Sequence, residues 1–182
     1  SNLNDSLSEN GEISSVGERG LLELLAVQNK IQAQLVEAFA AQNLNVKIEN
    51  GVIALDSSIL FGLDDAELSE EGKAYLDAFV DAFWSILADD SDYAGYISAV
   101  VVIGYTDSSG DDNYNLQLSE KRAQAVTDYC TEREFILSMF LRPVGAGSTD
   151  LIYSENGEED KEASRRVEFR IVFDEHGILH GE

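Results

Sequence analysis

The segment that most constrains the fold is an apolar run, ISAVVVIGY, at residues 97–105. Successive side chains of a strand face opposite sides of a sheet, so a strand that is apolar at every position needs cover on both faces. This pattern is typical of a central strand. An acidic residue, Asp107, follows it, and a second helical pattern, starting near Ser119, carries an arginine, Arg122. The sequence therefore predicts that a buried strand leads through a polar loop into a helix.

The remaining periodicity predicts the fold class. Helical spacing over 17–42 and 69–88, a hairpin or bulged strand around the ENG turn at 49–51, and strands over 139–146 and 165–173 complete the pattern. The order from the ENG turn onward is βαβαββ, and a βαβ unit takes parallel strands. The last two strands are joined by a loop, so we expect them to be antiparallel neighbours. We therefore expect an α/β (α+β) sandwich, a mixed sheet with helices on one face, preceded by an amphipathic N-terminal helix.

Four regions follow from this pattern. Residues 1–16 are polar and aperiodic and are expected to form a disordered linker. An amphipathic linker helix is expected over 17–44, a folded domain over 45–174 and a tail over 175–182. The apolar stripe of the helix packs on its own domain or pairs with a second copy as a short coiled coil, and we expect a homodimer. The stripe consists of Leu21, Leu24, Leu25, Gln28, Ile31, Leu35 and Phe39.

The charge excludes several classes of partner. The chain has 35 acidic and 12 basic residues, a net charge of −23. Nucleic acid binding needs a cation for each phosphate contact, so we expect no nucleic acid partner. An anionic membrane surface is disfavoured for the same reason. No run of 18 apolar residues occurs, so no membrane-spanning segment is expected within this sequence.

Asp107 and Arg122 are the candidate binding residues. If Ser119 is the N-cap of the second helix, Arg122 lies in its first turn and overhangs the end of the sheet where Asp107 begins the loop. A guanidinium at a positive helix end favours a carboxylate, and Asp107 favours an ammonium group. The pair therefore suits a zwitterionic ligand. The alternative, which the spacing leaves open, is a plain Asp107–Arg122 salt bridge that holds the loop.

Metal binding and catalysis have little support. The segment DSSGDD at 107–112 lacks the alternating ligands and closing glutamate of a calcium loop. The two histidines, His176 and His180, lie in the tail, and no base is placed beside a nucleophile. We expect no metal, no cofactor and no enzymatic activity.

Three motifs resemble a known family. GYTD (104–107), NLQLSEKRA (115–123) and RRVE (165–168) occur in the order and spacing of the OmpA-like domain, the peptidoglycan-binding module shared by OmpA, Pal and MotB proteins. The resemblance covers residues 52–173. The resemblance implies that Asp107 binds the amine, and Arg122 the carboxylate, of diaminopimelate in a peptidoglycan stem peptide. The further site residues that it implies are Thr106, Asn115, Leu118, Phe61 and one of Arg165 or Arg166.

Two departures from the family pattern, and the helix that precedes the domain, bear on this resemblance. Ser164 stands where the family usually has Asn, and GAGSTDLIYS at 145–154 departs from the usual turn, so altered ligand contacts are expected there. The long preceding helix resembles MotB-type stator proteins, which implies an envelope protein that is anchored in a membrane by a segment before this sequence and meets a membrane partner subunit there. The alternatives are a Pal-like lipoprotein and an interaction module that has lost peptidoglycan binding. Location in the cell envelope, periplasmic or extracytoplasmic, follows from any of the three.

Overall fold

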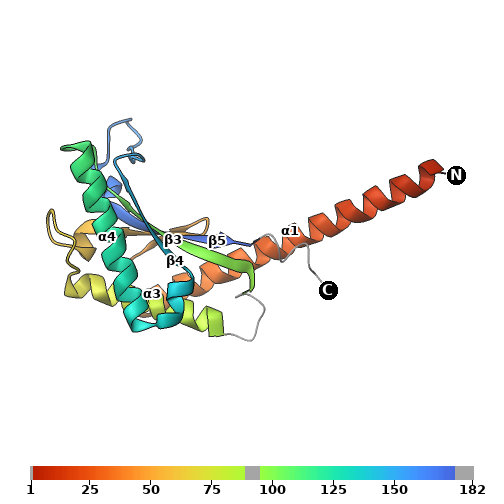
Figure 1. Ribbon diagram of the computed structural model, residues 1–182, viewed down its shortest axis with the longest axis horizontal. Helices are drawn as coiled ribbons and strands as arrows, with labels where there is room; N and C mark the ends of the chain where they lie inside the picture. Colours follow the sequence, from red (N-terminus) through yellow and green to blue (C-terminus); the bar gives the residue numbers. More distant parts are fainter. Residues whose placement is uncertain (1, 89–94, 175–182) are drawn as a thin grey trace.

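The computed structural model describes residues 2–88 and 95–174 as a five-stranded sheet with helices (Figure 1). The elements in chain order are α1 (Asn2–Ala41), β1 (Lys47–Glu49), β2 (Val52–Asp56), α2 (Ser57–Leu60), α3 (Glu70–Ala88), β3 (Ile97–Tyr105), α4 (Asp112–Arg133), the 3₁₀ helix η2 (Phe135–Met139), β4 (Leu141–Gly147), α5 (Lys161–Ser164) and β5 (Arg166–Phe173). The predicted fold class is confirmed. The predicted tail at 175–182 lies outside the described residues.

The strand order is β1-β2-β5-β3-β4. β3 and β4 are parallel and are joined through α4, as the βαβ pattern predicts. β5 is antiparallel to both β2 and β3, between which it lies. The prediction that the last two strands are neighbours is therefore wrong. A central position suits β5, because Val167 and Phe169 are fully buried on one face and Arg166 and Glu168 are buried on the other.

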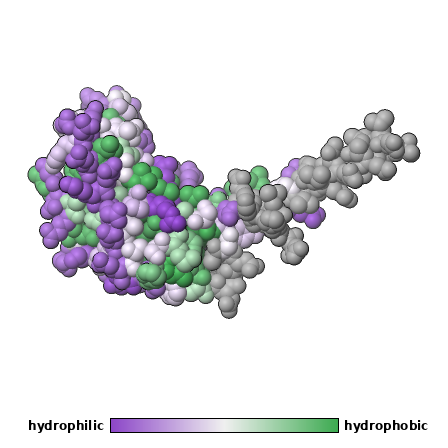
Figure 2. All heavy atoms as spheres, in the orientation of Figure 1, coloured by the Kyte–Doolittle hydropathy of each residue, from purple (hydrophilic) through white to green (hydrophobic). Residues whose placement is uncertain are grey.

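The helices form one layer against the sheet. The Phe79 ring of α3 packs at a tilt against the Phe169 ring of β5, and Phe83 of α3 meets Phe140, just before β4, edge to face. Ala123 and Val126 of α4 belong to the same core cluster. Hydrophilic residues gather on the outer side of α4 (Figure 2). The opposite face of the sheet is covered by neither α3 nor α4, and the short helix α5 lies at one end of it.

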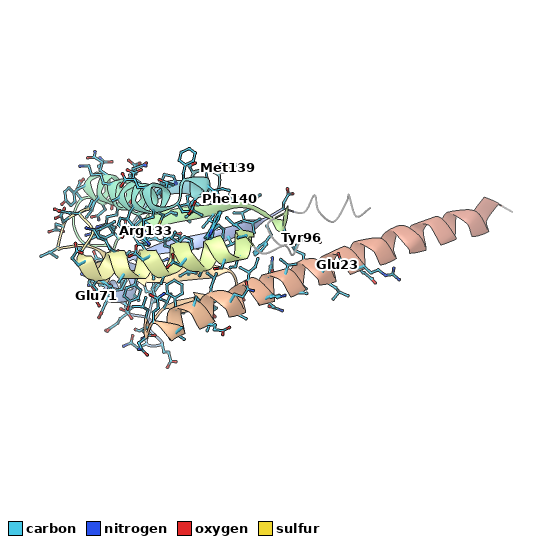
Figure 3. The ribbon with its side chains drawn as sticks, turned by 90° about the horizontal axis from the view of Figure 1, so that it is seen from below. Glu23, Glu71, Tyr96, Arg133, Met139 and Phe140 are labelled. Carbon is cyan, nitrogen blue, oxygen red and sulfur yellow. The ribbon has the colours of Figure 1, made fainter. Side chains whose placement is uncertain are left out.

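α1 is longer than the predicted linker helix. It begins at Asn2, so its backbone includes 2–16, where the sequence predicts a disordered linker. Once a helix is nucleated, each added residue gains a hydrogen bond at small cost, which lets polar residues extend it. α1 runs beside α3 and then extends beyond the other elements (Figures 1 and 3).

The apolar stripe of α1 is only partly buried. Ile31, Leu35 and Phe39 join the core of the same chain. This supports the first of the two alternatives for these positions. Leu21 and Leu25, predicted for the same stripe, are exposed at 54% and 46%. They form a second line of apolar residues that the chain's own domain does not cover.

The ENG turn forms a tight hairpin between β1 and β2. Asn50 and Gly51 both have positive φ, 52° and 76°. Two successive left-handed residues are characteristic of a type I′ turn, which matches the twist of the paired strands. The hairpin alternative of the prediction is therefore the one that the structure contains.

Candidate functional site

Asp107 lies where β3 passes into the loop before α4, and both oxygens of its carboxylate are bound. Oδ1 accepts a hydrogen bond from the backbone N–H of Ser109 at 2.8 Å, and Oδ2 accepts one from Nη1 of Arg165 at 2.6 Å. Burial alone would raise the pKa of Asp107, but the hydrogen bonds from Arg165 and Ser109 outweigh it and hold the pKa below its ordinary value. Asp107 is therefore an ionised and oriented carboxylate.

Arg122 is a buried cation, 6% exposed, held by carbonyl oxygens. Its Nε donates to the Asp65 carbonyl at 2.8 Å and its Nη2 to the Gly62 carbonyl at 3.4 Å. The Phe61 ring lies against the guanidinium, 5.1 Å from ring centre to carbon. Burial lowers the pKa of Arg122, while the charges of Asp64 and Asp65 oppose that shift. In the described part of the chain no carboxylate forms an ion pair with this guanidinium.

The start of α4 corrects the predicted position of Arg122. The helix begins at Asp112, and Asp111 is the N-cap, whose side chain accepts from the Tyr114 N–H at 2.9 Å. Ser119 is not a cap. It is fully buried, and its hydroxyl accepts from the Gly147 N–H at 2.9 Å. Arg122 therefore lies well inside the helix, and the helix end does not add to its attraction for an anion.

The two arginines of the RRVE motif separate, because successive residues of an extended chain face opposite sides. Arg165 binds Asp107. Arg166 lies on the sheet face opposite α3 and α4, over the Tyr105 ring at 4.0 Å, and forms ion pairs of 3.2 Å with both Glu168 and Asp150. Of the two predicted candidates, Arg165 is therefore the one placed at Asp107.

Three other predicted residues shape the surroundings. The Thr106 N–H donates to the Gly147 carbonyl at 2.8 Å, and its hydroxyl donates to the Asp107 carbonyl at 3.0 Å. Asn115 Nδ2 donates to the Ser109 carbonyl at 2.8 Å. Both residues thus fix the loop that carries Asp107. Leu118 is half-buried on α4.

A glycine brings α4 close to β3. A Cβ added at Gly104, the first residue of GYTD, would lie 2.3 Å from the Ser119 carbonyl oxygen, inside van der Waals contact. Only a residue without a side chain permits this approach. The glycine of the motif is thus explained by the packing that sets Arg122 beside the strand end.

Sequence reasoning missed the residues that tie the loops together. The carboxylate of Glu159 accepts from the N–H of Ser108 at 2.9 Å and from its hydroxyl, and Lys161 Nζ donates to the Ser109 hydroxyl at 2.9 Å. The acidic loop before β5 therefore fastens the loop after β3. A separation of 51 residues leaves no spacing signal, and the carbonyls of Gly62 and Asp65 carry no side-chain signature at all.

Asp107, Arg165 and Arg122 form the centre of the site, and the carboxylates of Asp64, Asp65 and Glu159 lie around them. Asp107 pairs with Arg165 and Arg122 with carbonyls, so the alternative of a plain Asp107–Arg122 salt bridge is wrong. Burial lowers the pKa of Arg122, the charges of Asp64 and Asp65 oppose this shift, and the charge of Arg165 adds to it. Since no carboxylate of the described residues forms an ion pair with Arg122, its guanidinium can still accept one from a ligand.

Neither metal ligation nor a membrane span is found in the described residues. No group of three or more His, Cys, Asp or Glu residues among them could hold a metal ion. Nor is any helix there both long and apolar enough to cross a bilayer. His176 and His180 lie outside the described residues.

Comparison with known proteins places this chain in a family. Residues 60–165 match the OmpA family. The chain is 35% identical over 105 residues to outer membrane protein A of Serratia marcescens, covering 58% of this chain and 27% of that protein. It is 34% identical over 123 residues to outer membrane protein A of Escherichia fergusonii, covering 65% and 48%. The chain belongs to the OmpA family and is an OmpA-like peptidoglycan-binding domain, of a family without enzymatic activity.

Solved structures share the fold. A MotB-like protein from Desulfovibrio vulgaris aligns with a TM-score of 0.63 at 21% identity, covering 84% of this chain and 94% of that one. The cell wall anchor of the type VI secretion system from Pseudomonas aeruginosa aligns with a TM-score of 0.57 at 22% identity, covering 79% and 97%. The chain spans less than half of the two relatives named outer membrane protein A. These relatives are envelope proteins by name.

Proposed function

We propose that this domain binds the diaminopimelate residue of a peptidoglycan stem peptide, with Asp107 holding the ammonium group and Arg122 the carboxylate. The observation that carries the proposal is the state of Arg122. A buried cation is unfavourable unless it is paired, and among the described residues Arg122 has carbonyl oxygens and the Phe61 ring as direct partners but no ion pair, with Asp64 and Asp65 acting on it without forming one. A ligand carboxylate would complete the charge balance.

We expect the ligand to replace part of the interaction between Arg165 and the Asp107 carboxylate. Its guanidinium occupies Oδ2 of Asp107, but its side chain is 41% exposed, so it can move without opening the core. An ammonium group near Asp107 would share this oxygen or displace Arg165. The displaced guanidinium would remain beside Arg122 and add to the attraction for the ligand carboxylate.

Cosedimentation with purified diaminopimelate-type sacculi tests the proposal. Asp107→Ala and Arg122→Ala should each lose about tenfold or more in binding, because each removes one charge-assisted contact. Arg133→Ala is the matched control, since Arg133 lies on the same helix but pairs with Asp77. Circular dichroism verifies that each variant is folded. Wild-type cosedimentation by both site variants would place the ligand elsewhere.

We further propose that the domain anchors a membrane-attached protein to the wall, in the manner of a MotB-like stator subunit. The fold similarity to a MotB-like protein and to a cell wall anchor, together with the long α1, supports this arrangement. A Pal-like lipoprotein is the runner-up. The gene's upstream sequence separates the two, since a membrane span indicates the first and a lipidation signal the second. Loss of sacculus binding in the parent protein would favour an interaction module instead.

Pairing of two copies through α1 is part of the same proposal. Leu21, Leu22 and Leu25 are exposed on a helix whose adjacent stripe packs on the chain's own core. Exposed leucines that recur along one helix suit a second helix of the same kind. Light scattering of the parent should show a dimer and of Leu21→Glu/Leu25→Glu a monomer, with Glu23→Gln as the control. A monomeric parent would remove the dimer from the account.

A further inference from the structure

The face of the sheet opposite α3 and α4 carries a groove that the Asp107 site does not use. It has a volume of about 550 Å³ and follows β2 between β1 and β5. Val52 and Ala54 form a small apolar floor, and Lys47 and Glu49 of β1 form one wall. The flanking strands are two spacings apart, roughly 10 Å, which is the width of one extended chain lying along β2. The volume is in the range of small-ligand sites.

The opposite wall is a fixed row of charged groups on β5. Glu168 accepts from Arg166 Nε at 3.2 Å through Oε1, and from Arg170 Nη2 at 2.9 Å through Oε2. The side chains of Arg166 and Glu168 are 6% and 9% exposed, whereas Arg170 is 43% exposed. These guanidinium and carboxylate groups hold one another in place on a rigid strand. Planar polar groups fixed in this way are suited to hydrogen bonding with amides and hydroxyls.

The groove is less acidic than the rest of the chain taken as a whole. Four of the 12 Lys and Arg residues and five of the 35 acidic residues line the groove. The rest of the chain therefore holds 8 basic and 30 acidic residues. A wall polymer carrying carboxylates would meet less repulsion here than elsewhere on the surface. The four cations are Lys47, Arg165, Arg166 and Arg170.

The groove extends to the end of the sheet that carries the Asp107 site, where Asp160, Glu162 and Ala163 at α5 also line it. Asp56 of β2 pairs with Arg166 of β5, and Arg166 pairs with Tyr105 of β3, just before Asp107. Arg165, which binds Asp107, lines the groove as well. A polymer held at Asp107 therefore reaches the mouth of the groove.

We propose that this groove is a second subsite for the wall polymer. It would hold the neutral amide and hydroxyl groups next to the diaminopimelate residue, and so it rests on the proposed function. Those groups belong either to the stem peptide or to the N-acetylated sugars that carry it. The subsite would make a whole muropeptide bind more tightly than its zwitterionic residue alone.

Nuclear magnetic resonance titration of the full chain tests the proposal with three probes: free meso-diaminopimelate, a stem tripeptide containing it, and the same tripeptide on its disaccharide. Free diaminopimelate should shift the amide resonances around Asp107 and Arg122 only. A larger probe should also shift those of Ala54, Glu168 and Arg170. A shift with the tripeptide assigns the groove to peptide, and one that needs the disaccharide assigns it to sugar. If no probe moves the groove resonances, the subsite is refuted.

Two substitutions separate this inference from the proposed function. Ala54→Arg fills the groove and should weaken binding of the disaccharide tripeptide about tenfold while leaving free diaminopimelate unchanged. Val144→Arg, on edge strand β4 outside the groove, is the matched control and should change neither. If Ala54→Arg does not fold, Lys47→Glu replaces it as the test. The Lys47 side chain is 77% exposed, and this substitution should weaken binding of the larger probe about threefold.

The outcomes are distinguishable. Parent-like binding of the disaccharide tripeptide by a folded groove variant overturns the subsite, whatever Asp107→Ala does. If Asp107→Ala no longer binds either probe and the groove variants bind both normally, the proposed function stands without the subsite. If Asp107→Ala binds both probes normally, the proposed function fails, and the subsite, which rests on it, fails in its present form.

Discussion

Two buried arginines in this domain have opposite surroundings. Arg166, on the sheet face opposite α3 and α4, is paired with Glu168 and Asp150 and covers Tyr105. Arg122, on the inner side of α4, is equally buried but is held by two carbonyls and the Phe61 ring. A buried cation whose charge is balanced within the chain supports the fold, whereas one left without a carboxylate is available to a ligand. This contrast is the reason for proposing Arg122, and not Arg166, as a ligand-binding residue.

Replacing Arg166 should have the largest effect on folding. Arg166→Met removes the partner of a buried carboxylate, and the free energy of unfolding should fall by about 3 kcal/mol. Urea denaturation followed by circular dichroism measures this. Asp150→Asn, which affects the more exposed partner, should cost less than about 1 kcal/mol. A stability loss of similar size in both variants would contradict the role given to the buried Arg166–Glu168 pair.

Replacing Arg122 should reverse the pattern. Arg122→Met removes a desolvated charge that has no carboxylate partner and keeps apolar contact with Phe61, so the free energy of unfolding should change by less than about 1 kcal/mol. Binding to sacculi should nevertheless fall about tenfold or more. The same denaturation and cosedimentation assays apply. If Arg122→Met unfolds the domain as Arg166→Met does, the two arginines are alike and the comparison fails.

Weakening the hydrogen bonds between Glu159 and Ser108 should reduce binding by an intermediate amount. Glu159→Gln weakens the acceptor that holds both the N–H and the hydroxyl of Ser108. The Asp107 loop should then lose part of its preorganisation, and sacculus binding should weaken about threefold. Glu155→Gln, in the same acidic loop, is the control. Unchanged binding by Glu159→Gln would show that Asn115 and Thr106 fix the loop without it.

The smallest expected effect is a pH dependence from Asp107. Its folded-state pKa is below its ordinary value of 3.8, so the unfolded state binds more protons in this range. The stabilisation is therefore present above pH 3.8 and is lost as the pH falls through the folded-state pKa. Denaturation of the parent and of Asp107→Asn at a series of pH values should converge below that range. Parallel curves at every pH would contradict the ionised state assigned to Asp107.

Local patterns predicted the elements well. The apolar run at 97–105 is β3 with the predicted bounds, and the helical spacing at 69–88 is α3, Glu70–Ala88. Such patterns record which side chains of a short segment are buried, and this is a local property. Asp107 and Arg122 were found for a related reason, since a charge next to an apolar strand or on a packed helix face is visible in sequence.

Long-range arrangements were not predictable from the same signals. The insertion of β5 between β2 and β3 depends on pairing between segments far apart in the chain. Likewise, Arg122 finds its partners in backbone carbonyls at Gly62 and Asp65, which any residue type supplies. The start of α4 was misplaced because Asp111, Asp112 and Asn113 are common in loops but also suit a helix start.

Calorimetry with two muropeptides that differ only in one carboxylate tests the central claim most directly. The diaminopimelate form offers an ammonium and a carboxylate, and the lysine form offers only the ammonium. The parent should bind the diaminopimelate form about tenfold or more tightly, because Arg122 gains its missing anion only there. Arg122→Met should bind both forms with equal, weak affinity. Equal affinity of the parent for the two forms would contradict the account and return Arg122 to a structural role.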